Sequence, residues 1–383
     1  MTSWSNSPFP GVVDIGTLGP AGRTLGENTG ESRRVVELSN HPGWLLKEYY
    51  TPATPTDIRR LDELIELPRR MGSVDLAMVN RATGWPVARV TRGGGTVGVV
   101  LPLAPARFSA EFRLPSGKPQ VRTLLIDLLA MPDAYLTERG ITGQAPRDRM
   151  AVCANVAAVG ALFERHHLVY LDWSYANIFW SRVDHCVFVI DIDGCSFGPR
   201  LQTENINWSD PLVPRKHMAG IEVDRYRVAL LTARCLTGRR ETPAATAALE
   251  ALAAQDGTTT EAITRLVVQA VSATSLDGRP KLAELHGALA RAVQGSGGTW
   301  QPTVEPPPDG VKEWREIRPP AAASAPPDQP PGQPSRPAQP AHPGGSPETG
   351  SPETGSPETG AGIVLVVTVV VVLIVILVLV FKH

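Results

Sequence analysis

Cysteine is scarce in this sequence. The chain has four cysteines among its 383 residues, and no two of them have the spacing that is typical of zinc ligands or of a disulfide framework. We therefore expect a reducing compartment, in which each cysteine behaves as a small buried apolar residue. The four are Cys153, Cys186, Cys195 and Cys235.

An excess of either charge is also missing. Lys and Arg number 37 against 38 Asp and Glu, and the formal net charge is −1 at pH 7. Domains that bind nucleic acid usually carry a basic patch or stripe that attracts phosphates. This balance of charge therefore argues against a nucleic acid partner.

The first residues lack the features of an export signal. A secretory signal begins with a basic region that is followed by an apolar stretch. Neither is present in the opening residues, MTSWSNSPFPGVVDIG. We therefore expect the bulk of the chain to be cytoplasmic.

Charge disappears altogether near the other end of the chain. Ile363 to Phe381 is apolar except for Thr368, and Lys382 and His383 follow it. As a helix, these nineteen residues would span roughly 28 Å, close to the ~30 Å hydrocarbon core of a bilayer. A helix satisfies its own backbone groups in lipid, whereas an isolated strand does not. The run predicts a transmembrane helix over 362–381 and hence a single-pass membrane protein with a cytoplasmic N-terminal domain.

The residues before this run resemble a linker. Residues 299–361 are rich in Pro and poor in aliphatic side chains, which is typical of extended or disordered chain. They end in three copies of SPETG, at Ser346–Gly350, Ser351–Gly355 and Ser356–Gly360. A spacer between domain and membrane is the simplest interpretation. Phosphorylation beside proline, and partner docking on segments such as Pro306–Pro308, stay open.

The remaining residues have globular composition, and their pattern changes along the chain. Four strand-like segments in the first hundred residues are followed by mostly helical patterns from Leu124 onward. We therefore predict an α+β fold with a β-rich N-terminal lobe at 15–105, a helical lobe at 106–298, and a cleft between them. The predicted strands are Arg33–Leu38, Gly43–Tyr49, Pro86–Thr91 and Thr96–Leu101. The predicted helices are Ala151–Phe163, Tyr226–Leu236 and Lys281–Val293.

One helix interrupts the predicted strands. Thr54 is a suitable N-cap, and Pro55 suits the first helical position. Apolar residues then recur on one face, which predicts an amphipathic helix packed against the sheet. They are Ile58, Leu61, Leu64 and Ile65.

Leu168–Gly198 holds the densest set of polar groups. Asp172 is followed five residues later by Asn177, and a strand-like run leads into Asp191 and Asp193. Amide and carboxylate oxygens where a strand meets a loop suit Mg²⁺, which needs few protein ligands beside substrate phosphates. A nearby Asp could accept a proton from a hydroxyl. Ordinary turn formation by Asp and Asn is the alternative explanation.

This spacing resembles that of the eukaryotic-like protein kinases. Asp172, Asn177 and Asp191 match the family's catalytic loop and metal-binding segment, and VFVIDIDGCSF is similar to the IDxDSF segment of a divergent bacterial branch. The resemblance implies a bilobal protein-kinase-like fold that uses ATP and Mg²⁺, with Asp172 as the catalytic base and Asn177 and Asp191 as metal ligands. Asp191 is favoured over Asp193 because the apolar strand leads directly into it.

The same resemblance extends toward the N-terminus. LGENTGESRRVVE, with Gly26 and Gly30, is similar to the family's glycine-rich loop, and Lys47 in WLLKEYY is similar to its strand lysine. Both would contact ATP phosphates. A charge in such an apolar strand needs a partner, which the family supplies as a Glu on the next helix. Here no candidate is clearly placed, so the partner of Lys47 stays unassigned. The candidates are Asp57, Asp62, Glu63 and Glu66.

Later positions both fit the family and depart from it. Asp224 matches an Asp that ties the backbone of the catalytic loop, and Arg279-Pro280 resembles the end of the domain. Tyr170 and Leu171 stand where the family has His and Arg. Ser174 replaces the Lys that normally steadies the γ-phosphate, which should slow transfer.

Two functions follow from these residues. One is a membrane-tethered protein kinase that transfers the γ-phosphoryl group of MgATP to Ser or Thr of a protein. The alternative is a pseudokinase, a nucleotide-binding or partner-binding scaffold held at the membrane by its C-terminal helix. A small-molecule acceptor also stays open, because small-molecule kinases share the Asp…Asn…Asp geometry.

Overall fold

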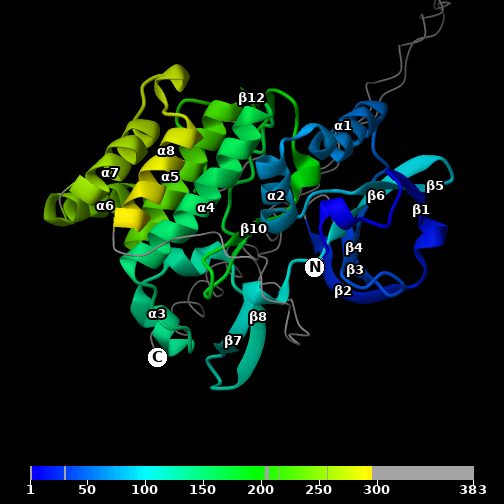
Figure 1. The fold of residues 1–383 in the computed structure, drawn as a ribbon, viewed down its shortest axis with the longest axis horizontal. Helices are drawn as coiled ribbons and strands as arrows, with labels where there is room; N and C mark the ends of the chain where they lie inside the picture. The colour runs from blue at the N-terminus through cyan, green and yellow to red at the C-terminus, as the bar shows by residue number, and fades with distance from the viewer. Residues whose placement is uncertain (1, 30–31, 203–206, 215, 257, 296–383) are drawn as a thin grey trace, which may run out of the picture. The chain divides into compact units, whose positions relative to one another are not determined.

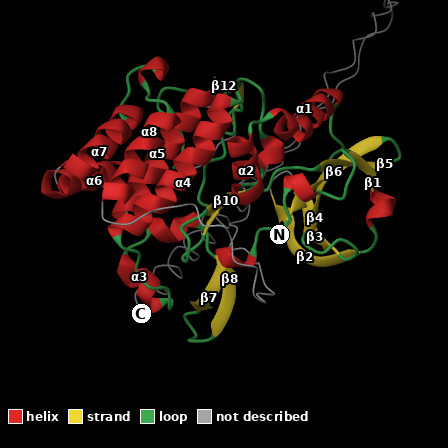
Figure 2. Ribbon diagram, viewed as in Figure 1, coloured by secondary structure: helices red, strands yellow, loops and turns green. Residues whose placement is uncertain are grey.

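The computed structural model describes residues 2–29, 32–202, 207–214, 216–256 and 258–295. In these residues a β-rich N-terminal part is followed by a mainly helical part (Figures 1 and 2). This confirms the predicted mixture of α and β structure and its order along the chain. None of the helices in the described ranges is long and apolar enough to cross a membrane. The predicted linker and the membrane helix at 362–381 lie outside the described residues.

A six-stranded sheet forms most of the N-terminal part. Its order is β1-β5-β6-β4-β3-β2, and every neighbouring pair is antiparallel except β1 and β5. The turn between β5 and β6 uses Gly93 and Gly94 at φ 56° and 84°, a conformation that glycine adopts at little cost. The strands are β1 (Val12–Asp14), β2 (Ala21–Thr29), β3 (Ser32–Leu38), β4 (Trp44–Tyr49), β5 (Ala88–Arg92) and β6 (Gly95–Pro102).

Two helices lie between β4 and β5. The first, α1 (Pro55–Glu66), begins as predicted: the Thr54 hydroxyl accepts the Asp57 backbone N–H at 3.2 Å. Its buried face holds three of the four predicted apolar residues, Leu61, Leu64 and Ile65. The second, α2 (Ser73–Ala82), follows. These caps and apolar spacings are local, which is why α1 could be predicted from the sequence.

The helical part is built around α4 (Pro146–Arg165), which is buried along most of its length. It packs against α5 (Ile221–Thr237) and α8 (Leu282–Gly295), beside one another in Figure 1. The three predicted helical segments lie within these three helices, except that Lys281 precedes the first residue of α8. The remaining helices are α3 (Asp133–Glu138), α6 (Thr242–Asp256) and α7 (Thr258–Val271).

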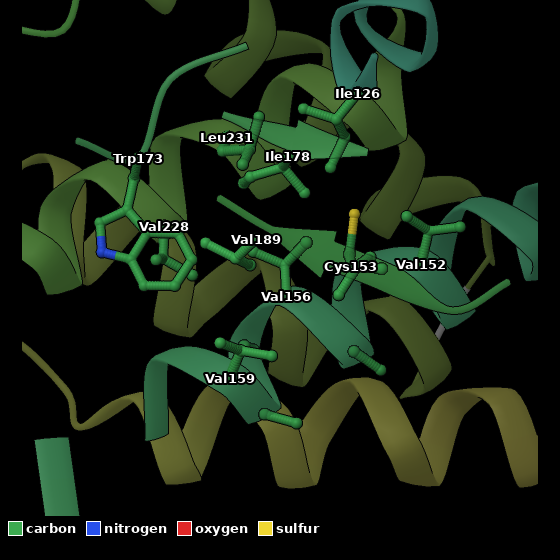
Figure 3. Close-up of a cluster of buried hydrophobic side chains, with 14 of the residues drawn as sticks. Ile126, Val152, Cys153, Val156, Val159, Trp173, Ile178, Val189, Val228 and Leu231 are labelled. Carbon is green, nitrogen blue, oxygen red and sulfur yellow. The ribbon is translucent and has the colours of Figure 1, made fainter. Parts of the chain in front are cut away.

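Short hairpins complete the helical part. One hairpin, of β9 (Ile178–Trp180) and β10 (Val187–Val189), lies on α4, and Figure 3 shows its Ile178 and Val189 beside Val156. A second hairpin projects from the body of the molecule in Figure 1. It consists of β7 (Ser109–Arg113) and β8 (Pro119–Thr123), and the last ladder joins β11 (Arg200–Leu201) to β12 (Met218–Ala219).

The four cysteines are free and buried, as their spacing predicted. Cys153 of α4 lies among the apolar side chains of the main core in Figure 3. Each thiol therefore packs as a small apolar group, and burial raises the pKa of the Cys186 thiol to about 11.

Candidate functional site

A cleft lies where the sheet faces the helical part. Counted out to the solvent at its mouth, it holds about 690 Å³, and residues from both parts line it. Lys47 and Asp191 line it together with Gly26. Its apolar walls come chiefly from Leu25, Val35, Leu45, Leu101, Leu125 and Phe179. The cleft therefore combines mainly apolar walls with the cation of Lys47 and the carboxylate of Asp191.

The β9–β10 hairpin brings two of the predicted residues together. Asn177 immediately precedes β9, and Asp191 follows β10 by two residues. Because the strands are antiparallel, with Ile178 opposite Val189, these two ends meet. The Ile190 backbone N–H donates to the Asn177 carbonyl at 3.0 Å and extends the ladder by one residue.

Asp172 belongs to the same small unit. The side-chain amide of Asn177 donates to the Asp172 carbonyl at 3.1 Å, and the Ser174 N–H donates to that carbonyl at 2.7 Å. Asn177 is buried and Asp172 half-buried. The loop 172–177 is thereby closed on itself, and its Asp and Asn are held in a fixed relation.

Lys47 has the partners that its apolar strand requires. It is 6% exposed, and its Nζ lies 3.3 Å from Oδ1 of Asp191 and 2.9 Å from Oδ1 of Asp193. Asp193 is buried too, and its second oxygen accepts the Tyr49 hydroxyl at 2.9 Å. Both carboxylates belong to the segment after β10, and neither was among the helix candidates named from the sequence.

The acidic residues of α1 are engaged elsewhere. Asp57 pairs with Arg60, Asp62 with Arg89, and Glu66 with Arg69; Glu63 is exposed. What α1 supplies to the site is a cation, Arg60.

The Arg60 Nη1 donates to the carbonyls of Asp193 at 2.6 Å and of Cys195 at 2.7 Å. Arg60 therefore fixes the turn after Asp191 through its backbone. No sequence pattern predicted this contact, because an Arg on an amphipathic helix is usually exposed to solvent.

Asp224 holds the loop before Asp172, as the resemblance implied. Its two carboxylate oxygens accept the backbone N–H groups of Tyr170 at 2.9 Å and Leu171 at 2.7 Å. Asp224 is 1% exposed, and burial raises its pKa to about 6 against the lowering effect of these hydrogen bonds. This assignment of a structural Asp is confirmed.

The residues that replace the family's His and Arg are built into the same network. The Tyr170 hydroxyl donates to the Ile190 carbonyl at 2.6 Å, next to Asp191. Arg227 of α5 donates to the Leu171 carbonyl, and Arg200 donates to the Tyr170 carbonyl at 2.8 Å. The loop and the segment after β10 are thus joined by hydrogen bonds from several elements.

Two residues of this hydrogen-bond network, Asp191 and Leu171, have a left-handed backbone conformation. Asp191 has φ 59° and ψ 32°, and Leu171 has φ 55°. Residues other than Gly adopt this left-handed backbone conformation at a cost in energy, and residues that do so cluster at functional sites. A strained Asp at the end of a strand, facing a cleft, is therefore a candidate for chemistry.

The donor set fits a magnesium ion completed by substrate oxygens. Asn177 and Asp191 provide an amide oxygen and a carboxylate, the hard ligands that Mg²⁺ takes. Among the described residues, no group of three or more His, Cys, Asp and Glu gathers as a metal site. Two protein ligands suffice only where phosphates supply others. Gly26 lines the cleft as expected for a backbone that approaches phosphate, whereas Gly30 lies outside the described residues.

No known family model matches the chain, and no curated protein is similar to it.

Proposed function

We propose that this chain is a protein-kinase-like phosphotransferase. It binds MgATP in the cleft and transfers the γ-phosphoryl group to Ser or Thr of a protein substrate, with its C-terminal helix as the membrane tether. The observation that carries the proposal is that Lys47 and Asp191 line one cleft, with Asn177 next to Asp191 where the ends of the β9–β10 hairpin meet. They come from a strand of the sheet and from a hairpin more than a hundred residues later in the chain.

The cleft suits a nucleotide in two ways. A purine is flat and apolar on its faces, and the aliphatic and aromatic walls from both parts of the molecule would enclose it. The same cleft is lined by Gly26, whose lack of a side chain allows phosphate oxygens close to the backbone, and by Lys47, whose ammonium would offset phosphate charge.

Catalysis of phosphoryl transfer depends mainly on positioning the two reactants and on neutralising the charge of the phosphates. The substrate hydroxyl oxygen forms a bond to the γ-phosphorus as the bond to the β-phosphate oxygen breaks, and ADP leaves. Asp172 acts as the general base and accepts the proton of that hydroxyl. The hydrogen bonds of the loop 172–177 fix its position. Asn177 and Asp191 would hold Mg²⁺, which would supply positive charge to offset that of the phosphates.

One departure favours the alternative, a pseudokinase that binds nucleotide or a partner without transfer. The position where the family has a Lys is Ser174, which is 7% exposed and directed into the protein rather than toward solvent. The site therefore lacks one cation for the γ-phosphate. In this alternative, MgATP binding persists and only transfer is absent.

Nucleotide binding by the full chain tests the part that both candidates share. We expect ATP to raise the melting temperature only when Mg²⁺ is present. Asp191→Ala should abolish this dependence on Mg²⁺, whereas the same change at the exposed Asp277 should leave it intact. A thermal shift in Asp191→Ala that matches the parent chain would contradict the metal assignment.

A further inference from the structure

The cation of the cleft is held by an unexpected partner. Lys47 is closer to Asp193 (2.9 Å) than to Asp191 (3.3 Å), and Asp193 is the more buried of the two, with a side chain 5% exposed against 24%. Asp191 lines the cleft. The two carboxylates therefore stand in different environments, although they are only two residues apart.

Asp193 is itself fixed on both sides. The Tyr49 hydroxyl, two residues along β4 from Lys47, donates to its second oxygen at 2.9 Å. Successive residues of a strand point to opposite faces, so Lys47 and Tyr49 reach Asp193 from the same face of the sheet. Arg60 of α1 meanwhile holds the Asp193 carbonyl at 2.6 Å. Side chain and backbone of Asp193 are thus both restrained.

We infer that Asp193 is the positioning residue for Lys47, the role that the family gives to a Glu on the helix after this strand. It rests on the proposed function, because it concerns how the lysine of that site is aimed at the phosphates. Asp193 holds the ammonium at the shorter distance, whereas Asp191, which contacts it at 3.3 Å, is the more exposed carboxylate and lines the cleft. Helix α1 takes part through Arg60 and the backbone, not through a carboxylate.

Removing the charge of Asp193 should therefore weaken the contacts to the phosphates of ATP and leave the contacts to adenosine unchanged. In Asp193→Asn the amide can still accept the Tyr49 hydroxyl, but Lys47 is left with Asp191 as its charged partner. We expect the full chain to bind MgATP about tenfold more weakly, which is the effect of losing one buried charge-assisted hydrogen bond. Affinity for adenosine, which has no phosphate, should change by less than about twofold. The matched control on α1, Glu63→Gln, should leave both affinities unchanged.

A double-mutant cycle separates positioning from a merely structural role. If Asp193 acts through Lys47, then Lys47→Met and the double variant Lys47→Met with Asp193→Asn should bind MgATP equally weakly. Independent losses that add in the double variant would overturn the inference, as would parental MgATP affinity in Asp193→Asn. Equal loss of ATP and adenosine would also overturn it, because that result indicates a damaged cleft.

A second variant covers the case in which Asp193→Asn does not fold. Tyr49→Phe keeps the ion pair and releases one side of the carboxylate, so MgATP affinity should fall about threefold with adenosine affinity unchanged. Parental affinity in Tyr49→Phe would then count against the inference. The proposed function fails separately: in that case the parent chain itself shows no binding of MgATP.

Discussion

Asp224 lies beneath the loop that carries Asp172 and accepts two backbone N–H groups from it. Its carboxylate is fully enclosed, and burial raises its pKa from the ordinary value of 3.8 to about 6. The native state therefore binds this proton more tightly than the unfolded chain does. Ionised Asp224 costs stability, and this cost is absent below about pH 4, grows as the pH rises through the interval up to about 6, and is complete above it.

Asp224→Asn, which stays neutral, should remove this pH dependence. Between about pH 4 and pH 7 we expect the free energy of unfolding of the parent chain to fall, relative to the variant, by on the order of 3 kcal/mol. The Asn side chain can accept only one of the two N–H groups through its oxygen. This lowers the free energy of unfolding of the variant by an amount that does not change with pH. Urea unfolding at several pH values measures the difference. Parallel curves for the two proteins would show that Asp224 does not titrate in this interval.

At the scale of single residues, the sequence predicted that Lys47 needs a partner but did not identify it. Helical periodicity places the residues of α1 relative to one another, and it says nothing of what lies opposite Lys47. The partners come from a segment more than 140 residues away whose direction depends on the left-handed backbone at Asp191. Tyr170 donates its hydroxyl to the Ile190 carbonyl. The sequence did not predict this contact, because the resemblance only marked Tyr170 as standing where the family has a His.

Strands β4 and β6 approach each other unusually closely beside Lys47. A Cβ at Gly98 would lie 2.2 Å from the carbonyl oxygen of Lys47 and 3.1 Å from the Cα of Glu48. Both atoms are backbone, so they could give way only if the strand moved. Gly98 is therefore required for the position of β4 and of the lysine it carries.

Gly98→Ala should destabilise the chain by about 1–3 kcal/mol, because it overpacks this contact. Gly95→Ala, in the same strand, is the control. Its Cβ would meet nothing closer than 3.7 Å, and we expect it to change stability by less than about 1 kcal/mol. Urea unfolding compares the two; equal effects would contradict the close approach.

A buried ion pair ties the segment between β11 and β12 to the residues before α8. Arg279 donates to both oxygens of Asp210, at 2.6 Å for Nη2, and both side chains are 0% exposed. Asp210→Ala leaves the guanidinium buried without its counter-charge and should cost about 3–5 kcal/mol.

The exposed pair of Arg69 and Glu66, at 3.1 Å, provides the comparison. Glu66→Ala should change the free energy of unfolding by less than about 1 kcal/mol, since water solvates both charges. If the two variants lose similar amounts, the account of Asp210 as a buried anchor is wrong.

Helices and strands whose own residues carry a cap, a turn or an apolar pattern were predicted from the sequence. Strands that form only by pairing with other strands of the sheet were not. The helix α1 carries its own cap and apolar face, and the β5–β6 hairpin its own glycine turn. Strand β1 has three residues and exists because it pairs with β5, about 75 residues later in the chain. Strand β2, AGRTLGENT, has the composition of a loop, and its pairing with β3 is irregular at two places. Its strand character comes from the sheet rather than from propensity.

At the scale of the whole molecule, the order of strands and helices was enough to predict a β-rich part followed by a helical part. The proposal of a C-terminal membrane tether rests on the hydropathy of Ile363 to Phe381. We expect Val372→Arg with Ile374→Arg to release the full chain from membranes, because each Arg at the centre of a membrane helix costs about 2.5–3.5 kcal/mol.

Fractionation after carbonate extraction measures this release. Ser346→Arg with Ser351→Arg adds the same charge to the SPETG repeats and should leave the chain in the membrane fraction. If the doubly charged 362–381 segment also stays there, the tether is not this helix.

Transfer of radiolabelled phosphate tests the central claim most directly. The full chain is incubated with Mg²⁺ and ATP labelled in the γ-phosphate, with a general protein substrate and its own SPETG repeats as acceptors. The account predicts labelled Ser or Thr with the parent chain, and no label with Asp172→Asn although that variant still binds MgATP. Equal labelling by both proteins, or a parent chain that neither binds nor transfers, would contradict it.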